Sequence, residues 1–362
     1  MNLFSMQKVE HWQGKKVLLR VDFNISLGEN GEVDENEDWR IKKILPTITF
    51  LRDRGAKIII LSHLGREKKT LKPIANYLNK FFKVKFIPSI LGEVVKEEIN
   101  KLKDSEVLLL ENLRQDEREE KNDQGFSKEL AELGDLYVND AFSVCHRKHA
   151  SIVSLPEFFP SYLGLQLEKE IENLELIIKK TEHPFLFILG GAKFETKIPL
   201  IEKYLKIADQ VFIAGALMNN FFREKGMNIK KSIISEGNFN IRGIINNRKL
   251  ILPDDLVWKN EMIVDVGDKS LQKLEEDIKK AKIILFNGPI GYYDQGSEEG
   301  TIKLLKMLTK SKAKVIIGGG DTLVLVEKLK LQDKFYFIST GGGAMLEFLL
   351  KGTLPGIEAL RG

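Results

Sequence analysis

Two glycine-rich segments near the end of the chain have the composition of anion-binding turns. Gly318–Thr322 and Ser339–Gly343 each contain three consecutive glycines. Each follows an apolar run and precedes a helical pattern, which predicts a strand, a turn and a helix N-terminus. Such a terminus carries unpaired N–H groups, and glycine lets an anion approach them. One such segment could be a plain loop, but two of them, one with Asp321 as a possible Mg²⁺ ligand, favour a nucleotide site.

Lysines and further glycines follow other predicted strands of the second half. The segment Gly190–Lys193 precedes a helical pattern in which Lys197 comes four residues after Lys193. This spacing predicts both ammonium groups on one helix face. Lysine at a helix N-terminus is unfavourable against the helix dipole, so two of them indicate a bound anion. Asn287–Gly291 is another glycine turn, and Asp294 beyond it could accept hydrogen bonds from ribose hydroxyls.

The first half places basic and polar side chains after successive predicted strands. Arginine binds phosphate and carboxylate groups through two parallel hydrogen bonds, so several arginines together suggest an anion that carries both groups. Each residue taken singly could be solvated or structural, and it is their recurrence at strand ends that points to a site. The positive patch expected there consists of Arg20, Arg40, His63, Arg66, Arg114, His146, Arg147 and His149, with Asp22 and Asn24 as acceptors for a substrate hydroxyl.

Alternating strands and helices are predicted from end to end of the chain. Most of the strands are continuous apolar runs, as in parallel strands that are buried on both faces. Helical patterns such as Leu71–Phe81 and Ile198–Ile207 lie between them, so we predict doubly wound parallel sheets, which bind ligands beyond the carboxyl ends of their strands. The clearest strands are Lys16–Val21, Lys57–Leu61, Glu106–Leu110, Leu136–Asn139, Phe185–Leu189, Gln210–Ala214, Lys282–Phe286, Lys314–Ile317 and Phe335–Ile338.

The length of 362 residues suggests two domains. Pro156 and Pro160 interrupt the pattern near the middle, and a long amphipathic helix is predicted to begin at about Leu163. We therefore expect an N-terminal lobe at residues 1–162 and a C-terminal lobe at residues 163–349, which opens with this connecting helix.

Composition limits the possible classes of function. Apolar residues make up 43% and charged residues 30% of the chain, as in a soluble globular protein. No apolar run reaches the length of a membrane helix, and a single cysteine, Cys145, fits a reducing cytoplasm. The net charge of +4 is spread among 56 basic and 52 acidic side chains, which does not favour nucleic-acid binding. We expect a cytoplasmic monomer without a membrane or nucleic-acid partner.

Several common nucleotide and metal motifs are missing from the sequence. It contains no G-x-x-x-x-G-K-[ST] phosphate loop and no G-x-G-x-x-G fingerprint, which makes a dehydrogenase of the usual dinucleotide-binding type improbable. It has no H-R-D or D-F-G signature of protein kinases and no zinc-type cluster of cysteine and histidine.

The motifs taken in order resemble the phosphoglycerate kinase family from about Arg20 to Leu360. The resemblance implies two lobes facing each other across a cleft, joined by a hinge helix. One lobe would bind 3-phosphoglycerate or 1,3-bisphosphoglycerate and the other MgADP or MgATP, with residues 350–362 returning to the first lobe. The matching motifs are Arg20–Asn24, Ser62–Arg66, Glu111–Arg114, Val138–Phe142, Gly190–Lys193, Asn287–Pro289, Gly318–Thr322, Ser339–Ala344 and Leu354–Leu360.

The resemblance also implies roles for individual residues. Arg40 and Lys193 would stabilise the transferring phosphoryl group, and Asp321 would hold Mg²⁺. The acid would be bound by Asp22, Phe23, Asn24, Arg40, His63, Leu64, Gly65, Arg66, Arg114, His146 and Arg147. The nucleotide would be bound by Gly191, Lys193, Lys197, Gly215, Gly267, Asn287, Gly288, Asp294, Gly318, Gly319, Gly320, Asp321, Thr322, Gly341 and Gly342.

Some positions differ from the family pattern. Thr196 stands where many members have Asp, Phe286 replaces a more usual Trp, and Asp268 replaces Pro. The loop after Arg66 and the chain itself are shorter than usual. Thr196 leaves a second carboxylate near the metal in doubt, and we expect the other changes to affect adenine packing or loop length. A catalytically weak, nucleotide-binding relative with a regulatory role is the alternative.

Overall fold

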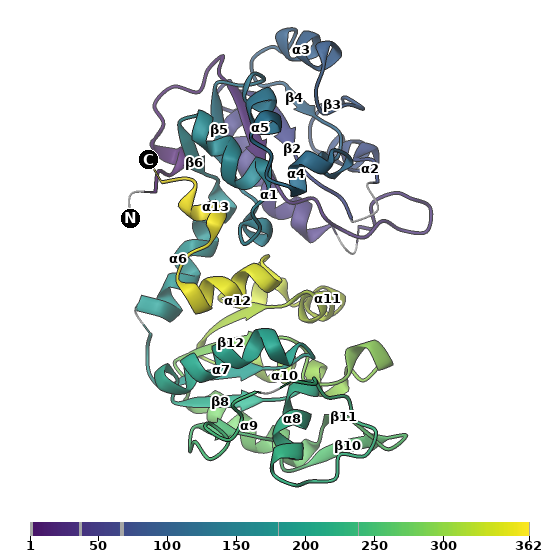
Figure 1. The fold of residues 1–362 in the computed structure, drawn as a ribbon, viewed down its shortest axis with the longest axis vertical. Helices are drawn as coiled ribbons and strands as arrows, with labels where there is room; N and C mark the ends of the chain where they lie inside the picture. Colours follow the sequence, from purple (N-terminus) through teal and green to yellow (C-terminus); the bar gives the residue numbers. More distant parts are fainter. Residues whose placement is uncertain (1–2, 36–37, 66–68, 180, 238, 362) are drawn as a thin grey trace. The chain divides into compact units, whose positions relative to one another are not determined.

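The computed structural model describes residues 3–35, 38–65, 69–179, 181–237 and 239–361. The chain forms two compact units, Met1–Glu172 with Thr353–Gly362 and Asn173–Gly352. Each unit contains a parallel sheet of six strands within the described residues, which confirms the predicted two-lobed α/β fold (Figure 1). The units divide inside helix α6 (Leu165–Lys179), whereas the sequence placed the division before that helix.

The sheet of the first unit has the strand order β3-β4-β2-β1-β5-β6, and all neighbours are parallel. Arg20 at the end of β1 is in register with Leu61 of β2 and Asn139 of β5, so the carboxyl ends of the three central strands lie along one edge. The strands are β1 (Lys16–Arg20), β2 (Lys57–Leu61), β3 (Val84–Phe86), β4 (Val107–Leu109), β5 (Leu136–Asn139) and β6 (Ser161–Leu163).

Helices cover this sheet and bury its apolar residues. On α1, the apolar side chains of Ile41, Ile44, Ile48 and Leu51 join the core cluster that contains Val17 and other strand residues. The helices are α1 (Trp39–Arg52), α2 (Lys72–Leu78), α3 (Glu93–Asn100), α4 (Glu117–Glu120), α5 (Gln124–Ala131) and α13 (Pro355–Glu358), with short helical turns η1 (Met6–Lys8), η2 (Leu113–Gln115), η3 (Phe142–Val144), η4 (Ala150–Ser154) and η5 (Leu155–Phe158).

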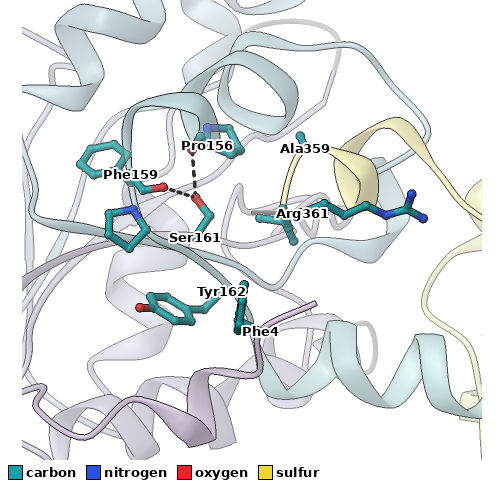
Figure 2. Close-up of a pocket in the computed structure, with 9 residues that line it drawn as sticks. Phe4, Pro156, Phe159, Ser161, Tyr162, Ala359 and Arg361 are labelled. Atoms are coloured by element: carbon teal, nitrogen blue, oxygen red, sulfur yellow. Dashed lines mark hydrogen bonds between the residues drawn. The ribbon is translucent and has the colours of Figure 1, made fainter. Parts of the chain in front are cut away.

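Both ends of the chain lie together in the first unit (Figure 1). Leu3 pairs with Arg361 in an antiparallel bridge, and the N–H of Gly356 donates to the Cys145 carbonyl oxygen at 2.8 Å. Beside them is a mainly apolar pocket of about 230 Å³, whose walls include Phe4 and Tyr162 (Figure 2). This pocket lies at the amino end of β6, whereas the predicted site residues follow the carboxyl ends of strands.

The sheet of the second unit has the order β14-β13-β12-β7-β8-β9 and is also parallel throughout. Asn287 of β12 is in register with Leu189 and Gly318, so the glycine turns after these strands begin side by side. The strands are β7 (Phe185–Leu189), β8 (Gln210–Ile213), β9 (Leu250–Ile251), β12 (Ile283–Asn287), β13 (Lys314–Gly318) and β14 (Phe337–Ile338), and β10 (Leu256–Lys259) and β11 (Met262–Val266) form a separate antiparallel pair.

In the second unit, α7, α8, α11 and α12 begin within five residues of the end of a strand of the six-stranded sheet, whereas α9 follows β11 and α10 begins after the turn η6. Helix α7 packs beside α12, and α10 contacts both α9 and α11. The helices are α7 (Phe194–Ile207), α8 (Ala216–Glu224), α9 (Asp268–Lys280), α10 (Glu299–Leu308), α11 (Gly320–Lys328) and α12 (Gly342–Lys351), with the turns η6 (Tyr293–Gln295) and η7 (Gln332–Lys334).

All nine strands expected from the sequence are present, with bounds that differ by no more than two residues. The strands that the sequence did not indicate are β3, β6 and β9 at sheet edges, and the separate pair β10 and β11. An edge strand is short and half exposed, so it lacks the continuous apolar run that marked the central strands.

A buried carboxylate fixes the start of α6 to the rest of the first unit. Asp140 directly follows β5 and is 1% exposed. Its Oδ1 accepts a hydrogen bond from the Leu167 N–H at 2.8 Å, and its Oδ2 accepts one from the Thr47 hydroxyl of α1 at 2.6 Å. Burial raises the pKa of Asp140 to about 6, although both hydrogen bonds oppose the shift.

This raised pKa makes the stability of the first unit depend on pH in a specific way. The contribution of Asp140 to the free energy of unfolding is fully present below the pKa of the unfolded chain, near 4, and is lost as the pH rises to about 6. Asp140→Asn keeps an acceptor for Leu167 and cannot ionise. We expect the stability of wild type relative to this variant to fall by about 2 kcal/mol between pH 4.5 and pH 7 in urea unfolding. A constant difference would contradict the assignment.

Candidate active site

An ionised aspartate organises the strand ends of the first unit. Arg40, the second residue of α1, and the hydroxyl of Ser143 both donate to Asp22 Oδ2. Asp22 Oδ1 accepts from the Asn24 N–H at 2.9 Å and lies 3.7 Å from His63 Nε2. Burial alone would raise the pKa of Asp22, but the charge of Arg40 and these hydrogen bonds hold it well below its usual range. Asp22, Arg40 and His63 therefore converge, as the sequence predicted.

A second group of basic side chains adjoins His63. Arg114 Nη1 donates to the Gly65 carbonyl oxygen at 2.8 Å, and its Nε lies 3.3 Å from the Glu120 carboxylate. Burial and the neighbouring charge of Arg147 lower the pKa of Arg114. The Nε atom of Arg147 is buried and has no hydrogen-bond partner among the described residues. An anion bound between these two arginines would relieve their mutual repulsion, so the pair is suited to binding one.

The histidines of the predicted patch are less charged than the sequence suggested. Burial and nearby arginines lower the pKa of His149 to about 4, and His146 contributes to that shift. Burial lowers the pKa of His63 well below its ordinary value. At neutral pH the charge of the patch therefore comes from its arginines, and His63 and His149 are neutral.

Arg20 does not belong to the exposed patch. Its side chain is 1% exposed, with Nε donating to the Ser151 hydroxyl at 2.8 Å and Nη2 lying 4.0 Å from the Glu119 carboxylate. The sequence placed Arg20 with the other cations because it also ends a strand. The residue is the last of β1 itself, and its side chain is directed into the interior of the unit.

The remaining residues predicted to bind the acid would act through the backbone or lie elsewhere. The side chains of Phe23 and Leu64 are buried in the core. Asn24 Oδ1 accepts from the Gly65 N–H at 2.8 Å, which joins the turns after β1 and β2. Arg66 lies outside the described residues.

Backbone packs directly against backbone at the strand ends of the second unit. The N–H of Gly191 donates to the Pro289 carbonyl oxygen at 2.8 Å. A Cβ atom on Gly190 would lie 2.2 Å from that oxygen, and one on Gly215, whose φ is +61°, would lie 2.6 Å from the Gly191 nitrogen. A Cβ on Gly288 would similarly meet the Gly190 carbonyl. These glycines are required for the turns to approach each other.

The first turns of two helices present free N–H groups beside these glycines. Among the described residues, no side chain caps α11 after Gly319 or α12 after Gly341. A Cβ on Gly320 or Gly342 would meet no atom within 4 Å, so this space is open. The hydroxyl of Thr322 is buried and has no hydrogen-bond partner within the described part of the chain. The N–H groups of both helix starts can therefore donate hydrogen bonds to phosphate oxygens.

Lys197 supplies a buried ammonium group next to the same turns. Its Nζ donates to the Gly190 carbonyl oxygen at 2.5 Å. Burial, with a smaller effect from the charge of Lys193, lowers the pKa of Lys197 to about 8, and the charge of Asp321 opposes the shift. Lys193 has non-helical backbone angles just before α7 and is exposed, so the two lysines do not share a helix face as expected. Thr196 donates to the Lys193 carbonyl oxygen at 3.1 Å.

Other residues predicted to bind the nucleotide have different surroundings. Asn287 is 3% exposed, and its Nδ2 lies 3.8 Å from the sulfur of Met345, which also fills the space beside Gly318. Gly267 precedes α9, and the Asp255 carboxylate occupies the space of its missing side chain. The side chain of Asp294 lies outside the described part of the structure.

A shallow apolar pocket adjoins Gly215 and was not indicated by the sequence. Its walls come from the start of α8, from the segment after α8, from β11 and from the turn after β12, and include Met218, Ile233, Met262 and Tyr292. No periodic pattern links these residues, so only the fold could bring them together. The space between these walls is about 10 Å³, so a flat, apolar ring could enter only if the walls moved apart.

Two supporting residues were also missed. Ser143, which donates to Asp22, comes from η3, and Glu119, which lies beside Arg20, comes from α4. Glu119 is one of several glutamates in a charged run, and it is the one that is fully buried. The period of the helix could have suggested an inward-facing glutamate, but not its partner.

The comparisons with known proteins agree over nearly the whole chain. A family model described as phosphoglycerate kinase matches residues 6–352. The phosphoglycerate kinase of Dictyoglomus turgidum is 40% identical over 386 residues, which cover 97% of each chain. That of Borrelia garinii subsp. bavariensis is 37% identical over 394 residues and covers 99% of this chain and 100% of its own.

Solved structures support the same relationship. The phosphoglycerate kinase from Coxiella burnetii superimposes with a TM-score of 0.84 at 30% identity, covering 99% of both chains. The enzyme from Pyrococcus horikoshii OT3 gives a TM-score of 0.86 at 30% identity, with coverage of 99% of this chain and 98% of that one. The chain belongs to the phosphoglycerate kinase family.

Proposed function

We propose that this chain transfers a phosphoryl group reversibly from the acyl phosphate of 1,3-bisphosphoglycerate to MgADP, giving 3-phosphoglycerate and MgATP. Its family makes it a kinase of glycolysis, a phosphotransferase with a carboxyl group as acceptor. The observation that carries the proposal is that each unit has one candidate anion site at the carboxyl ends of its parallel strands. The two candidate sites are of different kinds. The arginine cluster of the first unit would bind the acid, and the glycine turns of the second would bind the nucleotide.

Arginine geometry supports the assignment of the acid to the first unit. Arg40 is paired with the buried carboxylate of Asp22, whereas Arg114 and Arg147 repel each other nearby. A substrate that carries a phosphate and a carboxylate would neutralise the excess charge. Asp22 and Asn24 are placed to accept from its hydroxyl. Arg66 and His146 are proposed as further contacts.

The second unit offers backbone N–H groups where the nucleotide phosphates would lie. We assign the phosphates to the first turn of α11 and to Lys197, and the base to the apolar walls beside Gly215, which would move apart to admit it. Gly267 and Asp294 are proposed as ribose-side contacts. The buried Thr322 hydroxyl without a partner in the described residues supports a ligand at α11.

Asp321 is the residue proposed to hold Mg²⁺. No group of three or more metal-ligating side chains occurs among the described residues, and Asp321 is an exposed carboxylate that interacts with Lys197. One carboxylate fits Mg²⁺, which keeps several waters and arrives on the nucleotide phosphates. The ion, when bound, would neutralise phosphate charge.

We assign Arg40 and Lys193 to the oxygens of the transferring group. Phosphoryl transfer needs positioning and charge neutralisation more than covalent help, and the attacking ADP oxygen is already anionic. Arg40 is partly exposed at the edge of the acid site, and Lys193 is exposed just before α7. Both can therefore reach a ligand. Both sets of residues belong to one chain, and we propose a cytoplasmic monomer as the working unit.

No helix among the described residues has both the length and the apolar composition needed to cross a membrane.

Replacing either cation tests these roles and the function together. In an assay that couples ATP formation from ADP and 1,3-bisphosphoglycerate, we expect Arg40→Ala or Lys193→Ala to lower kcat by about 10³-fold, with smaller changes in KM. Lys43→Ala and Lys206→Ala, exposed lysines of α1 and α7, are the matched controls. An unchanged kcat rejects the assigned role. A wild-type chain that binds MgADP without turnover would instead support a regulatory relative.

The lowered pKa of Lys197 implies a pH-dependent affinity for ADP. The ammonium form binds phosphate, and its fraction falls as the pH rises through about 8. We expect the Kd for ADP, measured by calorimetry at fixed Mg²⁺, to increase by up to about tenfold from pH 7 to pH 9. Lys197→Met should bind weakly at both pH values, and Lys206→Ala should keep the wild-type dependence. A pH-independent Kd in wild type would contradict this.

Transfer requires the two ligands to meet, although their proposed sites are on different units. We propose that the connecting helix α6 is the hinge and that closure excludes water from the acyl phosphate. Small-angle scattering should show a smaller radius of gyration with 3-phosphoglycerate and a nonhydrolysable MgATP analogue together than with either alone. An identical radius in all states would count against closure.

A further inference from the structure

A buried chain of hydrogen bonds leads from Glu119 to His63. Glu119 Oε2 accepts from the Ser151 N–H at 2.9 Å, and its Oε1 accepts from the Ser151 hydroxyl at 2.6 Å. The same hydroxyl oxygen accepts from Arg20 Nε at 2.8 Å, and Arg20 Nη2 lies 3.3 Å from His63 Nδ1. All four residues are 1% exposed or less. A network so deeply buried cannot touch a ligand, except through His63 at its end.

The donors of this network determine which nitrogen of His63 carries the proton. A guanidinium group has five N–H donors and no acceptor. The contact between Arg20 and His63 is therefore a hydrogen bond only if Nδ1 is the acceptor, which places the histidine proton on Nε2. In a doubly protonated ring the N–H at Nδ1 would face an N–H of Arg20, and two donors repel each other. The contact therefore also disfavours the charged form of His63.

The carboxylate of Glu119 compensates the buried charge of Arg20 and so stabilises this arrangement inside the unit. Its Oε1 lies 4.0 Å from Arg20 Nη2, and it is the described carboxylate paired with that buried guanidinium. Tyr137 donates to the Ser151 carbonyl oxygen at 2.6 Å, which fixes the position of Ser151 from β5. Arg20 Nη1 donates to the Val21 carbonyl oxygen. The direction of the guanidinium group is thus set by contacts that involve three elements, α4, η4 and β5.

We propose that Glu119, acting through Ser151 and Arg20, is a positioning residue that holds His63 as a neutral Nε2–H donor for the acid substrate. The inference rests on the proposed function, because His63 belongs to the proposed acid site. His63 Nε2 lies 3.7 Å from Asp22 Oδ1, beyond hydrogen-bonding distance, so its proton is available to a substrate oxygen. The site thus recognises the acid through permanent arginine charges and one neutral donor, whose number of protons stays constant near neutral pH.

The charged and titratable groups around His63 support a ring that does not titrate between pH 6 and pH 8. Burial lowers its pKa most strongly. Arg20, Arg114 and His149 lower it further, and Asp22 is the group that raises it. His149 is itself neutral in this range, because burial lowers its pKa to about 4.

The wild-type chain provides the first test. The full chain with ¹⁵N-labelled histidine is examined by long-range ¹H–¹⁵N correlation at pH 6, 7 and 8, and His63→Gln identifies the signal. We expect a protonated Nε2 and an unprotonated Nδ1 at all three pH values. An Nδ1–H tautomer, or a ring that titrates in this range, would overturn the proposal.

Glu119→Gln tests the role of the carboxylate. The amide cannot accept from both Ser151 donors and leaves Arg20 without its buried counter-charge. We expect a second tautomer of His63 and a KM for 3-phosphoglycerate that is about three- to tenfold higher, with kcat and the KM for MgATP nearly unchanged. Glu117→Gln, an exposed residue of the same helix, should change neither. A wild-type spectrum and KM in Glu119→Gln would overturn the role of Glu119.

A second variant covers the case in which Glu119→Gln does not fold, as judged by circular dichroism. Ser151→Ala removes the hydroxyl that joins Glu119 to Arg20, so it should produce the same change in tautomer and in KM. A wild-type spectrum and KM in that variant would reject the network. Because the spectrum does not depend on turnover, failure of the proposed function appears as an inactive wild type, whereas failure of this inference appears in the spectrum of an active enzyme.

Discussion

Positive charge gathered at the carboxyl ends of parallel strands is the constraint on which the first unit depends. Each arginine there loses hydration and repels its neighbours, so the fold needs anions to offset the cost. Asp22 compensates Arg40, and the buried Glu119 compensates Arg20. Arg114 has a carboxylate at the exposed rim and is repelled by Arg147. An anionic substrate would neutralise the positive charge that remains uncompensated. Relief of this repulsion would then contribute to the free energy of binding.

In the second unit the groups proposed to bind anions are mainly backbone N–H groups rather than clustered side-chain charges. Its glycines divide into two groups by what a Cβ atom would meet. At Gly190, Gly215 and Gly288 it would collide with backbone of a neighbouring turn, so these residues let strand ends approach each other. At Gly320 and Gly342 it would meet nothing, so these residues leave space for a ligand. Close packing of the first group presents the free N–H groups of the second.

Local patterns were enough to predict the central strands and most of the convergent residues, because parallel strands place their carboxyl ends together whatever the helices do. The approach of His63, which follows β2, to Asp22, which follows β1, agrees with that rule. The burial of Arg20 does not, since a strand-end arginine can face inward only if a distant carboxylate such as Glu119 meets it. Edge strands such as β9 and the pocket beside Gly215 likewise depend on contacts between segments with no common period.

The departures from the family pattern have simple physical surroundings. The sequence suggested that the change at Phe286 affects adenine packing. Phe286 is fully buried in β12, so this position belongs to the core and not to a surface where adenine could pack. Asp268 begins α9, where an acidic residue is favourable against the helix dipole, and it pairs with Lys303. The Thr196 hydroxyl is directed to the Lys193 carbonyl oxygen and adds no charge. Under the proposed function, a metal that arrives with the nucleotide phosphates would be held by Asp321 in the first turn of α11, so nucleotide and metal binding would be a single event.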